Sequence, residues 1–387
     1  MCSPTQRSGA TPNASKAKKP LNSQSNSNQI YTSTLTSLRG ILAVWVVAFH
    51  FRHALETLFP ALQHIAPITA KGNLAVPAFF ILSGYILGEA HGGDFSRISK
   101  QAVTKFYLLR LARIYPVHLI TMLLSGSIAY TLLHFGYLES LSAFSAKDAL
   151  YNILLIHMWH PVAQLSWNYP SWSISSEWFA YLLFPFFAMM TARLGHQARP
   201  GFILLASLGL ALAGSEYYTR GHQQPFFGMV CIIPYFLSGL LFHQFQRYHD
   251  HRSIKLPRAL LHCCTAAVLV APFFLDGDAV SIVLLFVLTL MIFSLALSGT
   301  DSARGWQHPW LVSLGARSYS LYMTHALVQI ALYRILPAAE FAEGAFYVRA
   351  GIFGIYLTLI WLACSFCFRY CEQPSRTRLK KHILNRL

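Results

Sequence analysis

The chain has 387 residues, of which 55% are hydrophobic, 14% are aromatic and only 11% are Asp, Glu, Lys or Arg. A typical soluble domain has roughly 25% charged residues, so these charges are too few to cover a globule of this size. Composition therefore excludes a soluble enzyme, a disordered protein and a disulfide-stapled module. The net charge of +16 would suggest nucleic-acid binding in a soluble protein. Membrane proteins gather Lys and Arg in cytoplasmic loops, so no nucleic-acid partner is expected here.

Residues 1–34 are rich in Ser, Asn, Thr and Lys, which predicts a disordered basic cytoplasmic tail. Apolar runs near the roughly 20 residues needed to cross a bilayer follow it. They lie at 36–58, 73–91, 115–136, 175–192, 201–215, 226–243, 259–275, 279–298, 318–336 and 346–368. The shorter apolar segment 149–160 is expected to be re-entrant or interfacial on the outside. The sequence thus predicts an all-α, polytopic membrane protein with about ten transmembrane helices in residues 35–372 and a basic cytoplasmic tail at 373–387.

Positive charge predicts the orientation of these helices. With the N-terminus inside, the cytoplasmic loops and tails hold 24 of the 30 Lys and Arg residues. Because Lys and Arg favour the cytoplasmic side of a membrane, both termini are expected in the cytoplasm.

The first apolar run contains two ionisable residues, Arg39 and His50. Such residues are costly inside a membrane and are functional by default. They are eleven residues apart, so on a helix they share one face and are separated by about 16.5 Å. We expect Arg39 near the cytoplasmic boundary and His50 deep in the membrane; the alternative is a snorkelling arginine and a satisfied histidine. A second histidine, His325, is expected about two turns into the ninth run.

Two arginines precede the third run. Arg110 and Arg113 are i, i+3 neighbours if this segment is helical, and Pro116 disfavours helix at the residue before it. A guanidinium fork matches phosphate oxygens, so the pair suits a phosphate-bearing ligand, and ordinary positive-inside anchoring explains it equally well. In the second run, Ser83 and Gly84 allow close helix approach.

Glu177 lies near the fourth run among four tryptophans, Trp159, Trp167, Trp172 and Trp178. Interfacial aromatic belts account for part of this pattern. A carboxylate among aromatic rings is also what carbohydrate binding needs. The pattern predicts an acceptor site at the outer face, with a structural role as the alternative.

These motifs resemble one family when they are taken in chain order. They are Arg-x10-His, Phe-Phe-x-x-Ser-Gly-Tyr ending at Tyr85, Arg-x-x-Arg-x-x-Pro, Ser-Trp-Ser-x-x-x-Glu-Trp, Ser-Tyr-Ser-Leu-Tyr-x-x-His and Glu372-x-Pro374. Over roughly residues 35–378 the chain resembles the acyltransferase 3 family of membrane O-acyltransferases. Members of that family modify surface polysaccharides, lipopolysaccharide O-antigens, lipo-oligosaccharide signals and some antibiotics.

The resemblance implies transfer of an acyl group, expected to be acetyl, from cytosolic acyl-coenzyme A (acyl-CoA) to a sugar hydroxyl. The expected setting is a bacterial inner membrane. His50 matches the essential histidine of the family and Arg39 its partner. Arg110 and Arg113 match a cytoplasmic arginine pair. Glu177 and His325 match further motif positions and complete the expected catalytic set.

Acyl transfer to an alcohol needs a base and stabilisation of the tetrahedral oxyanion. We expect His50 either to deprotonate the acceptor hydroxyl or to carry the acyl group, and both routes stay open. Ser83, Tyr85 and Tyr322 are candidate donors to the oxyanion or the thioester carbonyl, and no metal is expected. Two other functions remain: transfer to a small secondary metabolite, and a transporter or flippase without acyl transfer, for which no inverted repeat is visible.

Overall fold

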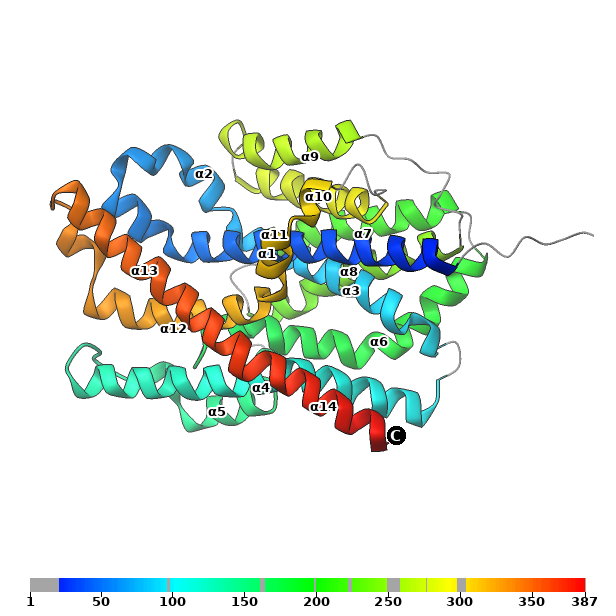
Figure 1. Cartoon of the computed structure of the whole chain (residues 1–387), viewed down its shortest axis with the longest axis horizontal. Coiled ribbons are helices and arrows are strands. Elements are labelled where there is room, and N and C mark those ends of the chain that lie inside the picture. Colours follow the sequence, from blue (N-terminus) through cyan, green and yellow to red (C-terminus); the bar gives the residue numbers. More distant parts are fainter. Residues whose placement is uncertain are drawn as a thin grey trace, which may run out of the picture.

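A computed structural model of the chain shows a helical bundle that is elongated along one axis (Figure 1). The structure describes residues 21–95, 98–160, 164–197, 200–221, 225–248, 258–275, 277–297 and 304–386. In these ranges all regular structure is helical and there is no strand. The prediction of an all-α chain is confirmed for this part of the molecule.

The helices overlap the predicted apolar runs, and some helices extend beyond them. In chain order they are α1 (Leu21–Leu58), α2 (Ala66–Thr69), α3 (Ala75–His91), α4 (Lys100–His134), α5 (Ala146–Ile153), α6 (Trp172–Gln197), α7 (Pro200–Gly221), α8 (Pro225–Tyr248), α9 (Arg258–Val270), α10 (Gly277–Leu297), α11 (Pro309–Ala316), α12 (Ser318–Ile335), α13 (Phe346–Cys367) and α14 (Gln373–Arg386). Each of the predicted apolar runs coincides with one of them.

Five helical segments in the described ranges are long and apolar enough to cross a membrane. They are Ser33–Leu58, Pro60–Phe95, Lys100–His134, Gly277–Leu297 and Phe346–Asn385. The chain is therefore a multi-pass membrane protein by the length and composition of its helices.

Two helices start earlier than the sequence predicts. Residues 1–20 of the expected tail lie outside the described residues, and α1 already begins at Leu21, before the boundary at residue 34. Helix α4 begins at Lys100 and continues through Pro116. A proline removes one backbone donor, yet the α-helical conformation continues across it. Helix α4 packs against α6, α12 and α14.

Glycines set the closest helix contacts. A Cβ atom on Gly84 of α3 would lie 1.9 Å from the carbonyl oxygen of Phe236, and one on Gly239 of α8 would lie 1.9 Å from that of Ile81. Helices α3 and α8 can approach this closely only because both positions lack a side chain. This confirms the close approach expected at Gly84, and it fixes which face of α3 is turned away from α8.

Candidate active site

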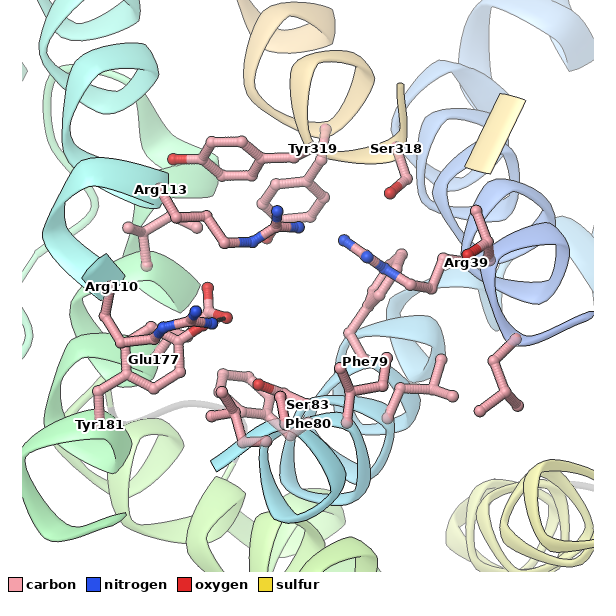
Figure 2. Close-up of a pocket in the computed structure, with 18 of the residues that line it drawn as sticks. Arg39, Phe79, Phe80, Ser83, Arg110, Arg113, Glu177, Tyr181, Ser318 and Tyr319 are labelled. Atoms are coloured by element: carbon pink, nitrogen blue, oxygen red, sulfur yellow. Dashed lines mark hydrogen bonds between the residues drawn. The ribbon is translucent and has the colours of Figure 1, made fainter. Parts of the chain in front are cut away.

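One cavity collects most of the predicted site residues. Its volume is about 740 Å³, and its walls come from α1, α3, α4, α6, α11, α12 and α14. Figure 2 shows the part formed by α1, α3, α4, α6 and α12. The predicted residues on its wall are Arg39, Ser83, Arg110, Arg113, Glu177 and Tyr322. Packing of distant helices therefore brings together side chains from almost the whole length of the chain.

The arginines face one another across this cavity. Arg39 extends from α1, and Arg113 extends toward it from α4 on the other side (Figure 2). Arg110, one turn before Arg113, places its guanidinium 5.9 Å from the ring of Tyr181. Guanidinium groups from two sides can hold phosphate oxygens between them, so the cavity suits an anionic ligand.

Glu177 lies in the arginine cavity instead of in a separate site with the tryptophans. Its carboxylate accepts a hydrogen bond from the Tyr181 hydroxyl, one turn further along α6. The next residue, Trp178, is about 100° around the helix and packs with its ring 6.0 Å from that of Tyr107. Neighbouring residues of one helix thus face different surroundings, which corrects the expectation that Glu177 and its tryptophans form one acceptor surface.

Two other tryptophans hold a loop in place. The indole N–H of Trp159 donates to the Ser175 carbonyl over 3.2 Å, and that of Trp167 donates to the Ser145 carbonyl over 3.1 Å. Trp167 also adopts a φ of 55°, a left-handed conformation that is uncommon for a side chain of this size. These indoles stabilise the connection into α6.

Tyr85 is not part of the cavity. Only 2% of its surface is exposed, and its hydroxyl donates to the side-chain carbonyl of Gln246 on α8. Ser83 and Tyr85 are two residues apart, so they point about 200° apart on α3. When Ser83 faces the cavity, Tyr85 must face α8, and this corrects the expected donor role of Tyr85.

The closed end of the cavity is formed by buried hydroxyl groups. Tyr322 is 8% exposed and Ser173 is 7% exposed. The Tyr322 hydroxyl accepts a hydrogen bond from Ser173 over 2.8 Å and donates to the Pro170 carbonyl over 3.1 Å. Polar groups therefore meet the end of any ligand that fills the cavity.

Both predicted histidines lie behind this closed end and not on the cavity wall. The ring of His325 is 5.9 Å from that of Tyr322, and the ring of His50 is 5.0 Å from that of His325. His325 is fully buried, and apart from carbonyls of its own preceding turn neither ring nitrogen has a hydrogen-bond partner among the described residues. His50 is half-buried. Tyr169 packs against both rings, at 5.0 Å from His50 and 6.1 Å from His325.

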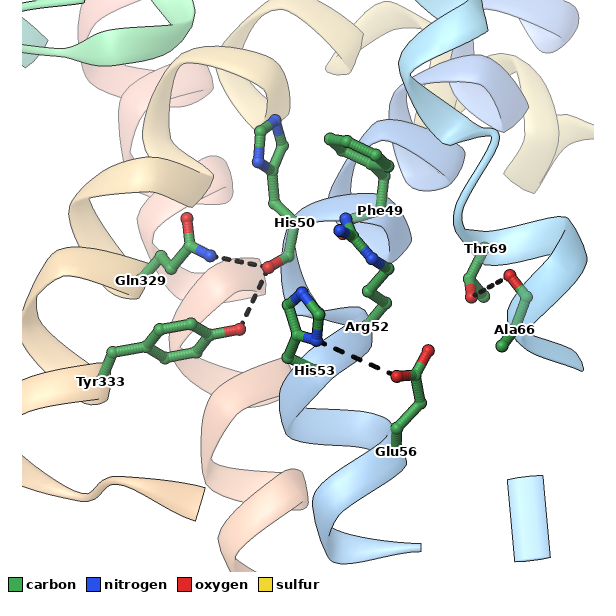
Figure 3. A network of polar contacts seen from close by, with 9 residues as sticks. All are labelled: Phe49, His50, Arg52, His53, Glu56, Ala66, Thr69, Gln329 and Tyr333. Atoms are coloured by element: carbon green, nitrogen blue, oxygen red, sulfur yellow. Dashed lines mark hydrogen bonds and ion pairs between the residues drawn. The ribbon is translucent and has the colours of Figure 1, made fainter. Parts of the chain in front are cut away.

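Polar side chains that the sequence analysis missed hold the backbone at His50. The amide of Gln329 donates to the His50 carbonyl over 2.6 Å, and the Tyr333 hydroxyl donates to the same oxygen over 3.0 Å (Figure 3). Gln329 also accepts a hydrogen bond from the Tyr169 hydroxyl over 2.5 Å. The signal was present in the sequence, because His325, Gln329 and Tyr333 follow one another at four-residue spacing on a single helix face.

The described residues contain no group of three or more His, Cys, Asp or Glu side chains that could hold a metal ion.

Comparison with known proteins identifies the family. A family model described as an acyltransferase domain matches residues 33–368. The chain is 37% identical to acyltransferase MdmB of Streptomyces mycarofaciens over 159 residues, which cover 39% of this chain and 38% of that protein. It is 23% identical to O-acetyltransferase OatA of Staphylococcus aureus over 380 residues, which cover 90% of this chain and 58% of that protein.

The matched region spans less than two thirds of the length of these relatives. No solved structure matches the chain. The family model covers α1 with its Arg39 and His50, the arginines of α4 and the histidine of α12. By this match the chain belongs to the acyltransferase 3 family.

Proposed function

We propose that this protein is a membrane O-acyltransferase that moves an acyl group, expected to be acetyl, from acyl-CoA to a sugar hydroxyl. The acceptor is a cell-envelope or extracellular polysaccharide or oligosaccharide. The proposal includes a topology of about ten membrane spans with both termini in the cytoplasm. It also places the protein in the inner membrane of a bacterial cell. The observation that carries it is an arginine-walled cavity whose closed end lies beside two adjacent histidines.

Acyl-CoA suits the cavity because its phosphates and its thioester lie at opposite ends of the molecule. Arg39, Arg110 and Arg113 offer guanidinium groups to the phosphates. The pantetheine arm would run along the apolar wall of α3 toward Tyr322, which brings the thioester carbonyl to the histidine end. Half-buried His50 leaves the acceptor an approach from the other side.

In the proposed reaction His50 accepts the proton of the acceptor hydroxyl, and the hydroxyl oxygen attacks the thioester carbon. Ser83 on the cavity wall, and Tyr322 once its hydroxyl leaves the Pro170 carbonyl, are the proposed donors to the oxyanion. Collapse of the tetrahedral intermediate breaks the C–S bond, and the departing thiolate takes the proton from His50. The products are one ester and one free CoA thiol. If His50 instead carries the acyl group, a labelled acyl-enzyme will accumulate in the absence of acceptor.

The test is acyl release from surface polysaccharide in a deletion strain complemented with wild type or with His50→Ala. Mild alkali frees the esters for mass spectrometry. We expect esters to be lost on deletion, restored by wild type and not restored by His50→Ala, with both proteins present in the membrane at equal levels. Restoration by His50→Ala would contradict the role of His50.

Other outcomes separate the alternative functions. An unchanged polysaccharide together with release of CoA thiol in membranes would point to a small secondary metabolite as acceptor. Movement of a sugar across the membrane without thiol release would point to a flippase.

A further inference from the structure

The C-terminal helix α14 forms part of the arginine cavity. Arg376 and Lys380 both line it, and their four-residue spacing places them on one face of α14. Helix α14 packs against α4, which carries Arg110 and Arg113. In Figure 1 it continues the line of α13 and crosses α4. The sequence predicts only a basic tail here, so these two cations are additions to the site.

A buried contact fixes the start of this helix. The π turn Phe368–Glu372 joins α13 to α14. Its last residue, Glu372, is 4% exposed and accepts a hydrogen bond from the Ser320 hydroxyl over 2.6 Å. Because α12 also carries Tyr322, this bond ties the direction of α14 to the helix that forms the closed end of the cavity.

Burial orders the cavity from solvent to its closed end. Arg376 and Lys380 are exposed, the three arginines of α1 and α4 are half-buried, and Tyr322 and Ser173 are buried. In this order from exposed to buried residues, helix α14 lies at the open end of the cavity, and the histidines lie behind the opposite end.

The charges extend over this whole length. Five cations line the cavity, namely Arg39, Arg110, Arg113, Arg376 and Lys380, against the two carboxylates Glu89 and Glu177. A single phosphate would engage one or two of these cations. A ligand with anionic groups at two separated positions engages both the exposed and the half-buried set.

We propose that Arg376 and Lys380 bind the ribose 3′-phosphate of acyl-CoA at the open end, while the three arginines bind its diphosphate. This inference rests on the proposed function, because it takes acyl-CoA as the ligand. The 3′-phosphate is the anionic group farthest from the thioester, and Arg376 and Lys380 are the most exposed cations of the cavity, whereas the histidines lie behind its buried end. Helix α14 is then a donor-recognition element and not only a membrane-surface tail.

The chain offers a matched control on the same helix. Arg378 and Lys381 are also exposed cations of α14, and neither lines the cavity. A double variant at these positions removes the same charge from the same helix. Any effect that the loss of two positive charges has on membrane association or on solubility is therefore common to both double variants.

The experiment measures binding of CoA and of 3′-dephospho-CoA to the purified full chain by calorimetry. We expect Arg376→Ala/Lys380→Ala to weaken CoA binding about tenfold and to leave 3′-dephospho-CoA binding at the wild-type value. Arg378→Ala/Lys381→Ala should match wild type for both ligands. Equal weakening for both ligands, equal weakening by both variants, or no CoA binding by wild type would overturn the inference; thermal unfolding verifies that each variant is folded.

Failure of this inference is distinguishable from failure of the proposed function. Acyl transfer from acyl-CoA with no difference between the two double variants contradicts only the role of α14. The expected binding pattern without ester formation contradicts only acyl transfer.

Discussion

Two pairs of histidines with adjacent rings in the described residues differ in their surroundings. His118 and His157 stack with ring centroids 6.0 Å apart and planes 4° apart, whereas His50 and His325 are 5.0 Å apart and tilted by 35°. In the first pair each Nε2 has a partner: His118 donates to the Asn152 carbonyl over 2.9 Å, and His157 is hydrogen-bonded to Ser171 over 3.2 Å. Within the part of the chain that the structure describes, His325 has no such partner outside its own helix turn.

The partners of the first pair belong to one polar network. The side-chain amide nitrogen of Asn152 donates to the Asp148 backbone carbonyl over 2.9 Å and to the Ser166 hydroxyl over 3.1 Å. The side-chain oxygen of Asn152 accepts a hydrogen bond from the Ser171 hydroxyl over 3.3 Å. This network ties α4 to α5 and to the turn before α6, so the pair stabilises the fold. An unpaired buried polar group costs about 1–3 kcal/mol. In the described part of the chain the Nδ1 atoms of His118 and His157 also lack a partner, so the two pairs differ at Nε2. The two pairs therefore differ in the hydrogen-bond partners of their ring nitrogens, and we expect this difference to distinguish a structural pair from a reactive pair.

The largest expected effect tests the catalytic role that we propose for His50 and His325. His325→Gln should lower kcat for acyl transfer by about 100-fold or more, because it removes an imidazole beside the reacting groups. His118→Gln is the matched change in the other pair and should leave kcat of the folded protein near that of wild type. Both are measured as CoA thiol release by purified protein. Equal losses of kcat in the two variants would remove the distinction between the pairs.

The free energy of unfolding should fall more when His118 is replaced than when His325 is replaced. His118→Ala removes one of the two hydrogen bonds that the Asn152 backbone carbonyl accepts, since the Leu155 amide still donates to it over 3.0 Å. Loss of this bond should lower the free energy of unfolding by about 0.5–1.5 kcal/mol, in addition to the loss of side-chain packing. His325→Ala leaves no hydrogen-bond partner behind and should lose only side-chain packing. Denaturant unfolding in detergent measures both variants. A smaller loss for His118→Ala than for His325→Ala would show that the polar network does not stabilise the fold.

The structural pair should also make stability depend on pH. His157 lies in the connection between α5 and α6, where burial, and then the neighbouring His118, lower its pKa to about 3. Below the ordinary pKa of about 6.5 the unfolded chain binds a proton that the folded one does not, so unfolding becomes easier by up to about 1.4 kcal/mol per pH unit. His157→Gln removes this contribution. Its melting temperature should therefore fall less than that of wild type between about pH 7 and pH 5; an equal fall in both would contradict the assignment.

The smallest effects should come from the groups that hold His50. Gln329→Leu removes two hydrogen bonds and should lower kcat about tenfold, and Tyr333→Phe removes one and should lower it about threefold. The KM for acyl-CoA should not change, because neither residue lines the cavity. A raised KM with unchanged kcat would mean that these residues act on donor binding instead of on His50.

The sequence by itself determined the helices and the family. Each membrane span must satisfy its own backbone hydrogen bonds, so a long apolar run can only be a helix, and the predicted runs coincide with helices. Local spacing also determined which residues share a face, as for Arg39 with His50 and Arg110 with Arg113. The ordered motifs led to the acyltransferase 3 family, which the match over residues 33–368 confirms.

Only the tertiary structure decided which faces meet. It put Glu177 among the arginines, turned Tyr85 toward α8, brought His50 to His325, and added Arg376 to the cavity. In a membrane protein the lipid-facing and the buried sides of a helix are both apolar, so hydrophobic periodicity does not mark the inward face. That choice depends on contacts between distant segments, such as the glycines that let α3 meet α8. Spacing along a single helix carries no information about such contacts.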